Sequence, residues 1–390
     1  MKERYFSLDV FRGATVAFMI LVNNPGDWSH IYAPLEHAAW HGLTPTDCVF
    51  PFFLFAVGNA MAFVFSRPGQ PGNIFFIKKI IWRSLLIFLI GLFLNWFPFI
   101  KWSDNHLIFK YWVGPDNPET GIRILGVLQR IALCYFFASF IIHYFKINGA
   151  VWWSMILLLG YWLLCFVLGS QPDPYSIQGY FGLPIDKKIL GIPHMYKGEG
   201  VPFDPEGIAS TIPAIVQVII GYFVGHYILI KGKNYEMLSN LLVAGSLLLF
   251  AGYCWNMAFP INKKIWTSSF VICTSGLAIM VLGLLIYLIE FKNAAGRWSN
   301  FFIPFGRNPL FVFALSGLIP RLLGLIRLAN GADNTGAAVY YTPLQWFYQH
   351  ICMPVSENLK NGSLLFAVIN VGFYWLICFW LDKRKIYIKV

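Results

Sequence analysis

The chain has 390 residues, of which 57% are hydrophobic and only 12% are charged. A soluble protein of this length needs a charged face on almost every helix, so this composition excludes a soluble globular fold. The net charge of +11 would suit a nucleic-acid ligand, but no nucleic-acid-binding motif accompanies it, and we expect the lipid bilayer as partner instead.

Ten apolar segments are long enough to cross a bilayer, which takes about 20 residues of helix. We therefore predict an all-α integral membrane protein, a single domain over residues 1–390 built as a polytopic bundle of about ten transmembrane helices. The ninth segment contains Pro304, Pro309 and Pro320 and is expected to kink or break. The predicted spans lie near residues 8–24, 47–66, 80–100, 121–145, 150–169, 208–230, 238–258, 265–289, 301–326 and 363–381.

Lysines and arginines crowd the short connections on one side of these spans, which the positive-inside rule places in the cytoplasm. An even number of spans then puts both termini on that side. The long outer segments 25–46, 170–207 and 327–362 are rich in Trp, Tyr, Pro and His, which favours ordered lids. The cations that set this orientation are Lys2, Arg4, Arg67, Lys78, Lys79, Arg83, Lys146, Lys231, Lys233, Lys292, Arg297, Lys383, Arg384, Lys385 and Lys389.

The densest polar cluster joins the first two spans. The first span ends in VNNPG, where the amide of Asn23 is suited to donate to a developing oxyanion. The following sequence HAAWHGLTPTD supplies His37, His41 and Asp47. A histidine close to a carboxylate is the natural general base for deprotonating an amine or a hydroxyl.

Two other interpretations of this cluster stay open. Thr44 and Asp47 have the spacing of a helix capping box, which would explain the carboxylate by local structure alone. His37 and His41 are four residues apart, as in some metal sites, but no HExxH-type carboxylate pattern accompanies them, and we expect no metal.

Further polar groups lie at the ends of other spans. Asp9 and Arg12 are three residues apart on one helix face and form either a structural salt bridge or part of a ligand site. Asp204 and Glu206 precede the sixth span, where they either stabilise the helix N-terminus or contact substrate. Groups that could surround one cavity with them are Arg130 of GVLQR, Lys264 of FPINKKIW, and Arg307 and Asn308 of PFGRNP.

These motifs resemble, in the same order, the heparan-alpha-glucosaminide N-acetyltransferase family of transmembrane acetyltransferases. The resemblance is carried by SLDVFRG, VNN, HAAWHGLTPTDCVFPFFLF, GVLQR, FDPEG, FPINKKIWTSSF and the asparagine of PFGRNP, so it spans nearly the whole chain. The sequence looks like a bacterial member that lacks the large luminal amino-terminal part of the animal enzymes.

The resemblance implies an inner-membrane enzyme, with both termini cytoplasmic, that moves an acetyl group from cytosolic acetyl-CoA to the amine of a glucosamine-type sugar on the periplasmic side. The family's essential histidine falls on His37 and its asparagine on Asn23. The animal enzymes resemble HASWNG where this chain reads HAAWHG, which favours His37 over His41 as the base. Asp47 would orient that base.

The two substrates imply further contacts. A CoA donor carries several phosphates, so its path should present cations, with Arg12, Arg130, Lys264 and Arg307 as candidates and Asn308 beside them. The expected contacts of the amino-sugar acceptor are Asp204, Glu206, Trp40 and His41.

Alternative functions also fit the sequence. A transporter for a sugar or peptidoglycan fragment is compatible with ten spans, but no internal repeat is visible. The same acyl chemistry could act on a hydroxyl of a polysaccharide or lipid. The sequence does not separate direct transfer from an acetyl-histidine intermediate, nor a monomer from a homodimer.

Overall fold

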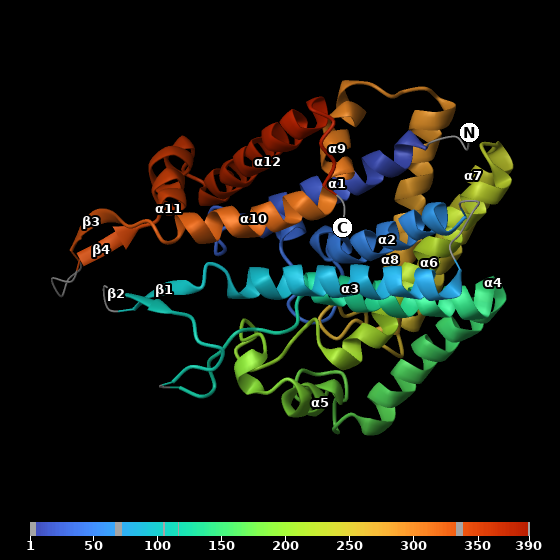
Figure 1. Cartoon of the computed structure of the whole chain (residues 1–390), viewed down its shortest axis with the longest axis horizontal. Helices are drawn as coiled ribbons and strands as arrows, with labels where there is room; N and C mark the ends of the chain where they lie inside the picture. The colour runs from blue at the N-terminus through green and yellow to red at the C-terminus, as the bar shows by residue number, and fades with distance from the viewer. Residues whose placement is uncertain (1–4, 67–71, 104–105, 116, 333–337, 389–390) are drawn as a thin grey trace.

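The computed structural model describes residues 5–66, 72–103, 106–115, 117–332 and 338–388, and it confirms the all-α membrane fold (Figure 1). Four of the cations used to orient the chain lie outside the described residues, namely Lys2, Arg4, Arg67 and Lys389.

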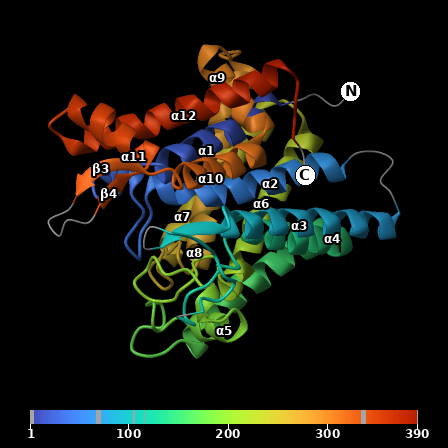
Figure 2. The same ribbon diagram turned by 60° about the vertical axis from the view of Figure 1, so that its left-hand side comes forward.

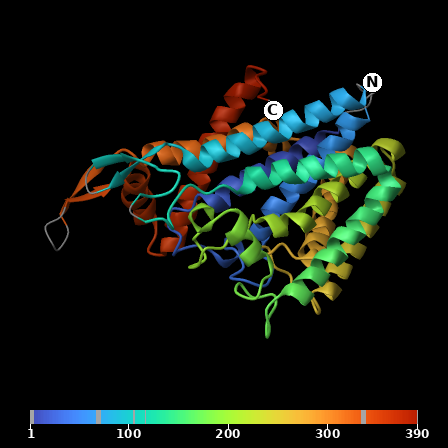
Figure 3. The same cartoon turned by 60° about the horizontal axis from the view of Figure 1, so that its bottom comes forward.

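The long helices form a centre and a periphery, which all three views show (Figures 1, 2 and 3). More than half of each central helix's apolar stretch is buried, in α1 (Phe6–Asn23), α2 (Val49–Phe65), α6 (Ile208–Lys231) and α8 (Ser268–Ile286). Large apolar side chains are exposed along the peripheral helices, as expected of lipid-facing surfaces. These are α3 (Asn73–Trp96), α4 (Val127–Leu168), α7 (Tyr235–Trp255) and α12 (Leu359–Lys383).

Close backbone contact holds α2 against α6. A Cβ atom on Gly58 would lie 1.9 Å from the carbonyl oxygen of Val218, and one on Gly221 would lie 2.1 Å from that of Phe55. Glycines at such crossings let two helices approach closely, which matters where lipid supplies no hydrophobic driving force between them. This contact sets the depth of α6 relative to α2, whose first residues line the candidate site.

Among the described residues, seven helices are long and apolar enough to cross a membrane, or eight if the bent pair α9 (Arg297–Arg307) and α10 (Pro309–Leu323) forms one span. This pair bends by 79° at Asn308, so the break predicted from the prolines is confirmed. The 42-residue α4 covers two predicted spans and is interrupted at Lys146, whose φ is 56°. Each of the ten predicted spans overlaps a helix, and ten crossings remain a prediction.

The segments expected on the outer side contain defined structure. Strand β1 (Ile100–Ser103) pairs with β2 (His106–Phe109) after α3, and β3 (Leu328–Ala332) pairs with β4 (Ala338–Tyr341) after α10, both antiparallel. The two hairpins meet where the Arg327 guanidinium lies 3.9 Å from the ring centroid of Trp102. The remaining elements are η1 (Ala33–Leu35), η2 (Pro45–Cys48), α5 (Gly182–Ile189), η3 (Ile192–His194), η4 (Tyr287–Phe291), α11 (Pro343–Phe347), η5 (Tyr348–Cys352) and η6 (Met353–Val355).

Candidate active site

A cavity of about 380 Å³ lies among the ends of the central helices. Its wall is formed by the last turn of α1, the first residues of α2 and α4, and the segments that precede α6 and α8. The lining residues on which the following argument depends are Asn23, His37, Asp47, Arg123, Glu206 and Lys263.

Asp47 holds His37 at the cavity wall. Its Oδ1 atom lies 2.7 Å from Nδ1 of His37, and the carboxylate is buried while the imidazole is 41% exposed. Because an ionised carboxylate only accepts hydrogen bonds, we assign the ring proton to Nδ1. The lone pair of Nε2 is then left for a substrate proton.

The second carboxylate oxygen completes the predicted capping box. Oδ2 of Asp47 accepts hydrogen bonds from the backbone N–H of Ala38 (3.1 Å) and of Thr44 (3.1 Å), and from the hydroxyl of Thr44 (3.0 Å). The backbone N–H of Asp47 donates to the Thr44 hydroxyl in return. The structural interpretation and the orienting interpretation of Asp47 therefore both fit, because each uses a different oxygen.

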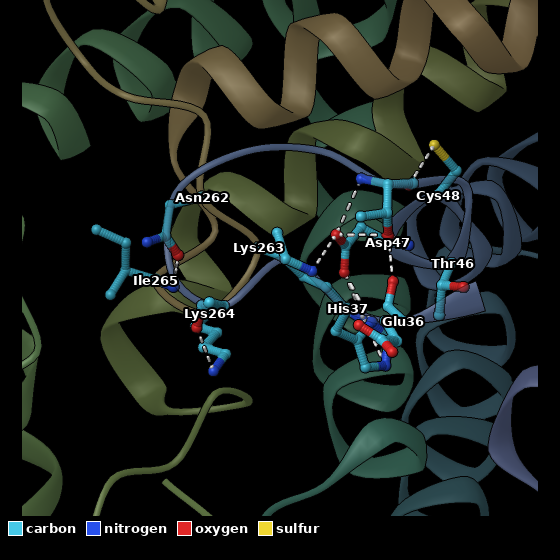
Figure 4. A network of polar contacts seen from close by, with 12 residues as sticks. Glu36, His37, Thr46, Asp47, Cys48, Asn262, Lys263, Lys264 and Ile265 are labelled. Carbon is cyan, nitrogen blue, oxygen red and sulfur yellow. Dashed lines mark hydrogen bonds and ion pairs between the residues drawn. The ribbon is translucent and has the colours of Figure 1, made fainter. Parts of the chain in front are cut away.

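Lys263 is the neighbour of this pair that the sequence did not assign to the site. Figure 4 shows its side chain reaching from the turn before α8 toward His37 and Asp47. Its Nζ atom lies 3.0 Å from Nδ1 and 3.4 Å from Nε2 of His37, and 3.5 Å from Oδ1 of Asp47. Burial lowers the pKa of Lys263, and the carboxylates of Asp47 and Glu206 oppose that shift.

The turn that carries Lys263 is held by buried side chains. The Asn262 side chain accepts from the backbone N–H of Ile265 (3.0 Å), and the Thr267 hydroxyl accepts from the N–H of Asn262 (3.0 Å). Thr267 also caps the N-terminus of α8. The sequence FPINKKIW predicts a tight outer turn with Asn262, Lys263 and Lys264, but nothing in it indicates which lysine faces the histidine.

Asn23 lines the same cavity from the last residue of α1, and its side chain is exposed. The amide of the adjacent Asn24 instead donates back to the carbonyl of Ile20 (2.8 Å), as expected of a helix stop. The two adjacent asparagines therefore have different environments, and Asn23 is the one that faces the cavity.

Arg123 explains the acidic pair before α6, and sequence reasoning missed it. Its Nε atom donates to Oδ2 of Asp204 (3.0 Å) and its Nη2 atom donates to Oδ1 (2.6 Å) and to Glu206. Arg123 and Glu206 line the cavity, whereas Asp204 is fully buried behind them. The acidic pair itself indicated a missing partner, because two carboxylates near membrane depth require a cation. The chain contains several cations, however, and the sequence does not show which of them is the partner.

Arg130 lies behind the cavity wall. One of its nitrogens donates to the carbonyl of Gly207 (3.2 Å) and to the Ser210 hydroxyl, and its guanidinium lies 5.0 Å from the ring centroid of Trp266, which lines the cavity. Within the described residues, its Nε and Nη1 atoms have no hydrogen-bond partner. A buried guanidinium with spare donors is unusual enough to keep Arg130 as a candidate for a ligand contact.

Of three further predicted contacts, Lys264 lines the cavity, whereas Trp40 and His41 do not. Lys264 donates to the carbonyl of Ala39 (2.8 Å) and pairs with Glu199. The Trp40 indole N–H donates to the carbonyl of Tyr175 (2.9 Å), and Nδ1 of His41 lies 3.3 Å from the Asn262 amide nitrogen. Burial lowers the pKa of His41.

Three of the predicted CoA contacts lie elsewhere. Arg12 pairs with Asp9 near the start of α1, which matches the structural salt bridge. Arg307 pairs with Asp382 at 2.7 Å, and the Asn308 side chain binds the backbone of Ile386 and Ile388 in the C-terminal tail. None of these three lines the cavity, and their role in CoA binding stays a prediction.

The cavity carries a balanced set of charges. Three carboxylates and three cations line it, and each carboxylate lies within pairing distance of a cation. Within the described parts of the chain, no three His, Cys, Asp or Glu side chains come close enough to hold a metal ion. The distinctive feature is therefore the imidazole that shares the Asp47 carboxylate with a lysine.

Comparisons with known proteins point to one family. The sequence profile described as "Heparan-alpha-glucosaminide N-acetyltransferase, catalytic" matches residues 4–252, which include Asn23, His37 and Asp47. The chain is 29% identical over 451 aligned positions to heparan-alpha-glucosaminide N-acetyltransferase from Homo sapiens and 26% identical over 446 to the Mus musculus protein. These alignments cover the whole of this chain but 60% and 61% of the relatives, so it spans about three fifths of their length.

Proposed function

Because the chain belongs to the heparan-alpha-glucosaminide N-acetyltransferase family, we propose that it transfers an acetyl group from acetyl-CoA to the amine of a glucosamine-type sugar. The observation that carries this proposal is the His37–Asp47 pair at the wall of an open cavity. This arrangement is suited to general base catalysis, because a buried carboxylate orients an exposed imidazole.

The reaction starts with the acceptor amine at Nε2 of His37. As the amine nitrogen attacks the thioester carbonyl, Nε2 takes its proton, and the C–S bond then breaks. The CoA thiolate leaves and recovers the proton from the imidazolium. Asp47 accepts from Nδ1–H throughout, which keeps the ring oriented and favours its protonated form when the proton arrives.

Asn23 is placed to assist the acyl group. Its amide faces the cavity, and a side-chain N–H there would donate to the oxygen on which charge develops during attack. Lys264 and Arg130 are the predicted cations on or behind the cavity wall, and we propose them for contacts to the donor. Glu206 and the aromatic ring of Tyr196 offer hydrogen-bonding and stacking surfaces to a sugar.

The proposed sidedness rests on charge. The cavity lies at the ends of α1, α2, α6 and α8 that face away from the lysine- and arginine-rich connections. We propose that this end faces the periplasm of a bacterial inner membrane, so that the acceptor arrives there and both termini are cytoplasmic. We also propose that residues 1–390 act as one domain.

The test is acetyl transfer from radiolabelled acetyl-CoA to glucosamine by the purified protein. His37→Ala should reduce product formation by about 10²–10⁴-fold, since it removes the general base. His30→Ala is a matched control, because His30 lies in the same connection but pairs with Asp27 instead. Undiminished product in folded His37→Ala would overturn the proposal, and sugar accumulation in vesicles without CoA would indicate a transporter.

The same assay separates two chemical routes. If His37 is acetylated first, acetyl-CoA alone should release CoA in a burst equivalent to one turnover and leave acetyl-enzyme. Direct transfer gives neither the burst nor the labelled protein in the absence of acceptor. Replacing glucosamine with its N-acetylated form, which still has hydroxyls, tests whether the acceptor atom is nitrogen or oxygen.

A further inference from the structure

Lys263 stands in an unusual position for a cation. Its Nζ atom is within 3.5 Å of three atoms, namely both ring nitrogens of His37 and Oδ1 of Asp47. Lys263 is 226 residues away from His37 in the sequence, so the turn before α8 brings it there. A lysine that only neutralised Asp47 would not need to contact the imidazole.

The available protons limit what this contact can be. Nδ1 of His37 already donates to Asp47, so the ammonium group cannot donate to that nitrogen as well. Its N–H groups can go to Oδ1 of Asp47. Because Nζ lies close to both ring nitrogens, it is beside the ring and off the axis of the Nε2 lone pair, which stays open to a substrate proton. The ammonium is therefore close to the atom that must take the proton from the acceptor, where a second positive charge on the ring would be repelled.

We propose that Lys263 is a positioning residue of the transfer reaction, whose ammonium group, held by Asp47, keeps the His37 ring neutral and able to accept a proton. This proposal rests on the proposed function. Lys263 makes no covalent bond and gains or loses no proton in the step. It acts through the charge that it places beside His37, and the same repulsion favours return of the proton from the imidazolium to the CoA thiolate.

Other charged groups around His37 compensate one another. Glu206 pairs with Arg123 across the cavity, and Glu199 pairs with Lys264. Burial lowers the pKa of Lys263, while the nearby carboxylates of Asp47 and Glu206 favour its charged form. The charged and titratable groups that line the same cavity as His37 are Asp47, Arg123, Tyr196, Glu199, Glu206, Lys263 and Lys264, and Glu36 is its neighbour in the chain.

The test is the pH dependence of acetyl transfer in Lys263→Met, which keeps the length of the side chain and removes its charge. Without the ammonium, His37 takes up a proton more readily. As the pH is lowered, the neutral imidazole that acts as the base is therefore converted to imidazolium at a higher pH than in the unmodified protein. We expect the acidic limb of the kcat/KM profile to move up by about one pH unit, which is about a tenfold loss at a pH on that limb. Lys263→Arg retains the charge and should keep the limb near its original position.

A second readout does not require turnover. Diethyl pyrocarbonate modifies the neutral imidazole, so its rate of reaction with His37, followed on the His37 peptide by mass spectrometry, reports the protonation of that ring. In Lys263→Met this rate should fall on the acidic side at a pH about one unit higher than in the unmodified protein. Lys263→Gln replaces Lys263→Met in both measurements if the methionine variant does not fold.

Lys264→Met is the matched control, because it removes a cation that lines the same cavity but pairs with Glu199. Whatever its effect on turnover, it should leave the acidic limb in place. Coincident profiles for Lys263→Met and the unmodified protein, or a shift to lower pH, would overturn the role of Lys263 while His37-dependent transfer stands. Absence of any acetyl transfer, with His37 modification unaffected by Lys263, would overturn both proposals.

Discussion

The two ends of the helix bundle use similar residues for different purposes. At the end that carries the chain termini, Arg12 pairs with Asp9, Arg307 with Asp382, and Lys233 with Glu290. At the cavity end, His37 and Lys263 share the carboxylate of Asp47 beside about 380 Å³ of open space.

This contrast distinguishes polar clusters that stabilise a membrane protein from those that indicate a catalytic site. In each of these three pairs at the terminus end, a cation has its own carboxylate, and the pair of Arg307 with Asp382 also joins α9 to α12. At the cavity end, an imidazole is held by a carboxylate with one ring nitrogen left to the cavity. The charged groups therefore form structural ion pairs at the terminus end and a candidate reaction centre at the cavity end.

The largest effect that would separate the two ends is expected from Asp47→Asn at the cavity end. Its amide oxygen can still accept from the N–H groups of Ala38 and Thr44, but its NH₂ group would face Nδ1 of His37 and favour the wrong tautomer. We expect kcat/KM for acetyl transfer to fall about 10³-fold, measured on protein whose thermal unfolding shows that it is folded. Thr44→Ala, which removes only the cap, should stay within a few-fold of the original activity, and similar losses in both variants would show that Asp47 acts as a cap alone.

The packing of α9 against α1 at the terminus end can be disrupted by a substitution that changes no charge. A Cβ atom on Gly306 of α9 would lie 2.0 Å from the carbonyl oxygen of Asp9, so Gly306→Ala must separate α9 from α1. We expect a loss of about 3 kcal/mol in the free energy of unfolding, seen as lower yield and a lower Tm in detergent. The control is Gly372→Ala, where no atom lies within 4 Å of the added Cβ, and equal losses in the two variants would contradict this account.

A carboxylate behind the cavity should make stability depend on pH. Burial raises the pKa of Asp186 to about 7, helped by the nearby Asp204, although the N–H of Ile208 donates to its carboxylate. The folded state therefore binds a proton that the unfolded state has released above pH 4, so stability falls as the pH rises from about 4 to 7.

Asp186→Asn should remove this penalty and stabilise the protein at pH 8 by about 2 kcal/mol relative to the unmodified chain. At pH 4 the two proteins should unfold at similar temperatures, because both side chains are then neutral. Thermal unfolding in detergent at several pH values measures the difference. A stabilisation that does not change between pH 4 and pH 8 would show that the Asp186 carboxylate is not its source.

The smallest effect is expected at a terminus-end ion pair. Asp382→Asn removes the partner of Arg307, and both side chains are partly exposed, so the loss should be below about 1 kcal/mol. Acetyl transfer per folded molecule should stay unchanged, because Asp382 lies away from the cavity. A large loss of transfer with intact stability would instead connect the terminus end to the donor and support the predicted role of Arg307.

Most of the fold could be predicted from the sequence, and so could the part of the candidate site that is formed by residues close together in the chain. The spans followed from apolar length, and the α9–α10 break followed from prolines that cannot continue a helix. His37 and Asp47 are ten residues apart, and the capping box of η2, which leads directly into α2, also brings the carboxylate to the imidazole. Arg12, Arg307 and Asn308 were grouped with the cavity because motif order does not reveal at which depth a residue lies.

The sequence by itself determined the membrane fold and the positions of the helices, and it offered the pairing of His37 with Asp47 as one interpretation beside the capping box, since these depend on composition and short-range geometry. Only the tertiary structure decided that Lys263 and not Lys264 reaches His37, and that Arg123 binds Asp204 and Glu206. Those contacts join residues 226 and about 80 positions apart. They depend on the relative depth and rotation of packed helices, which close glycine contacts such as those between α2 and α6 establish.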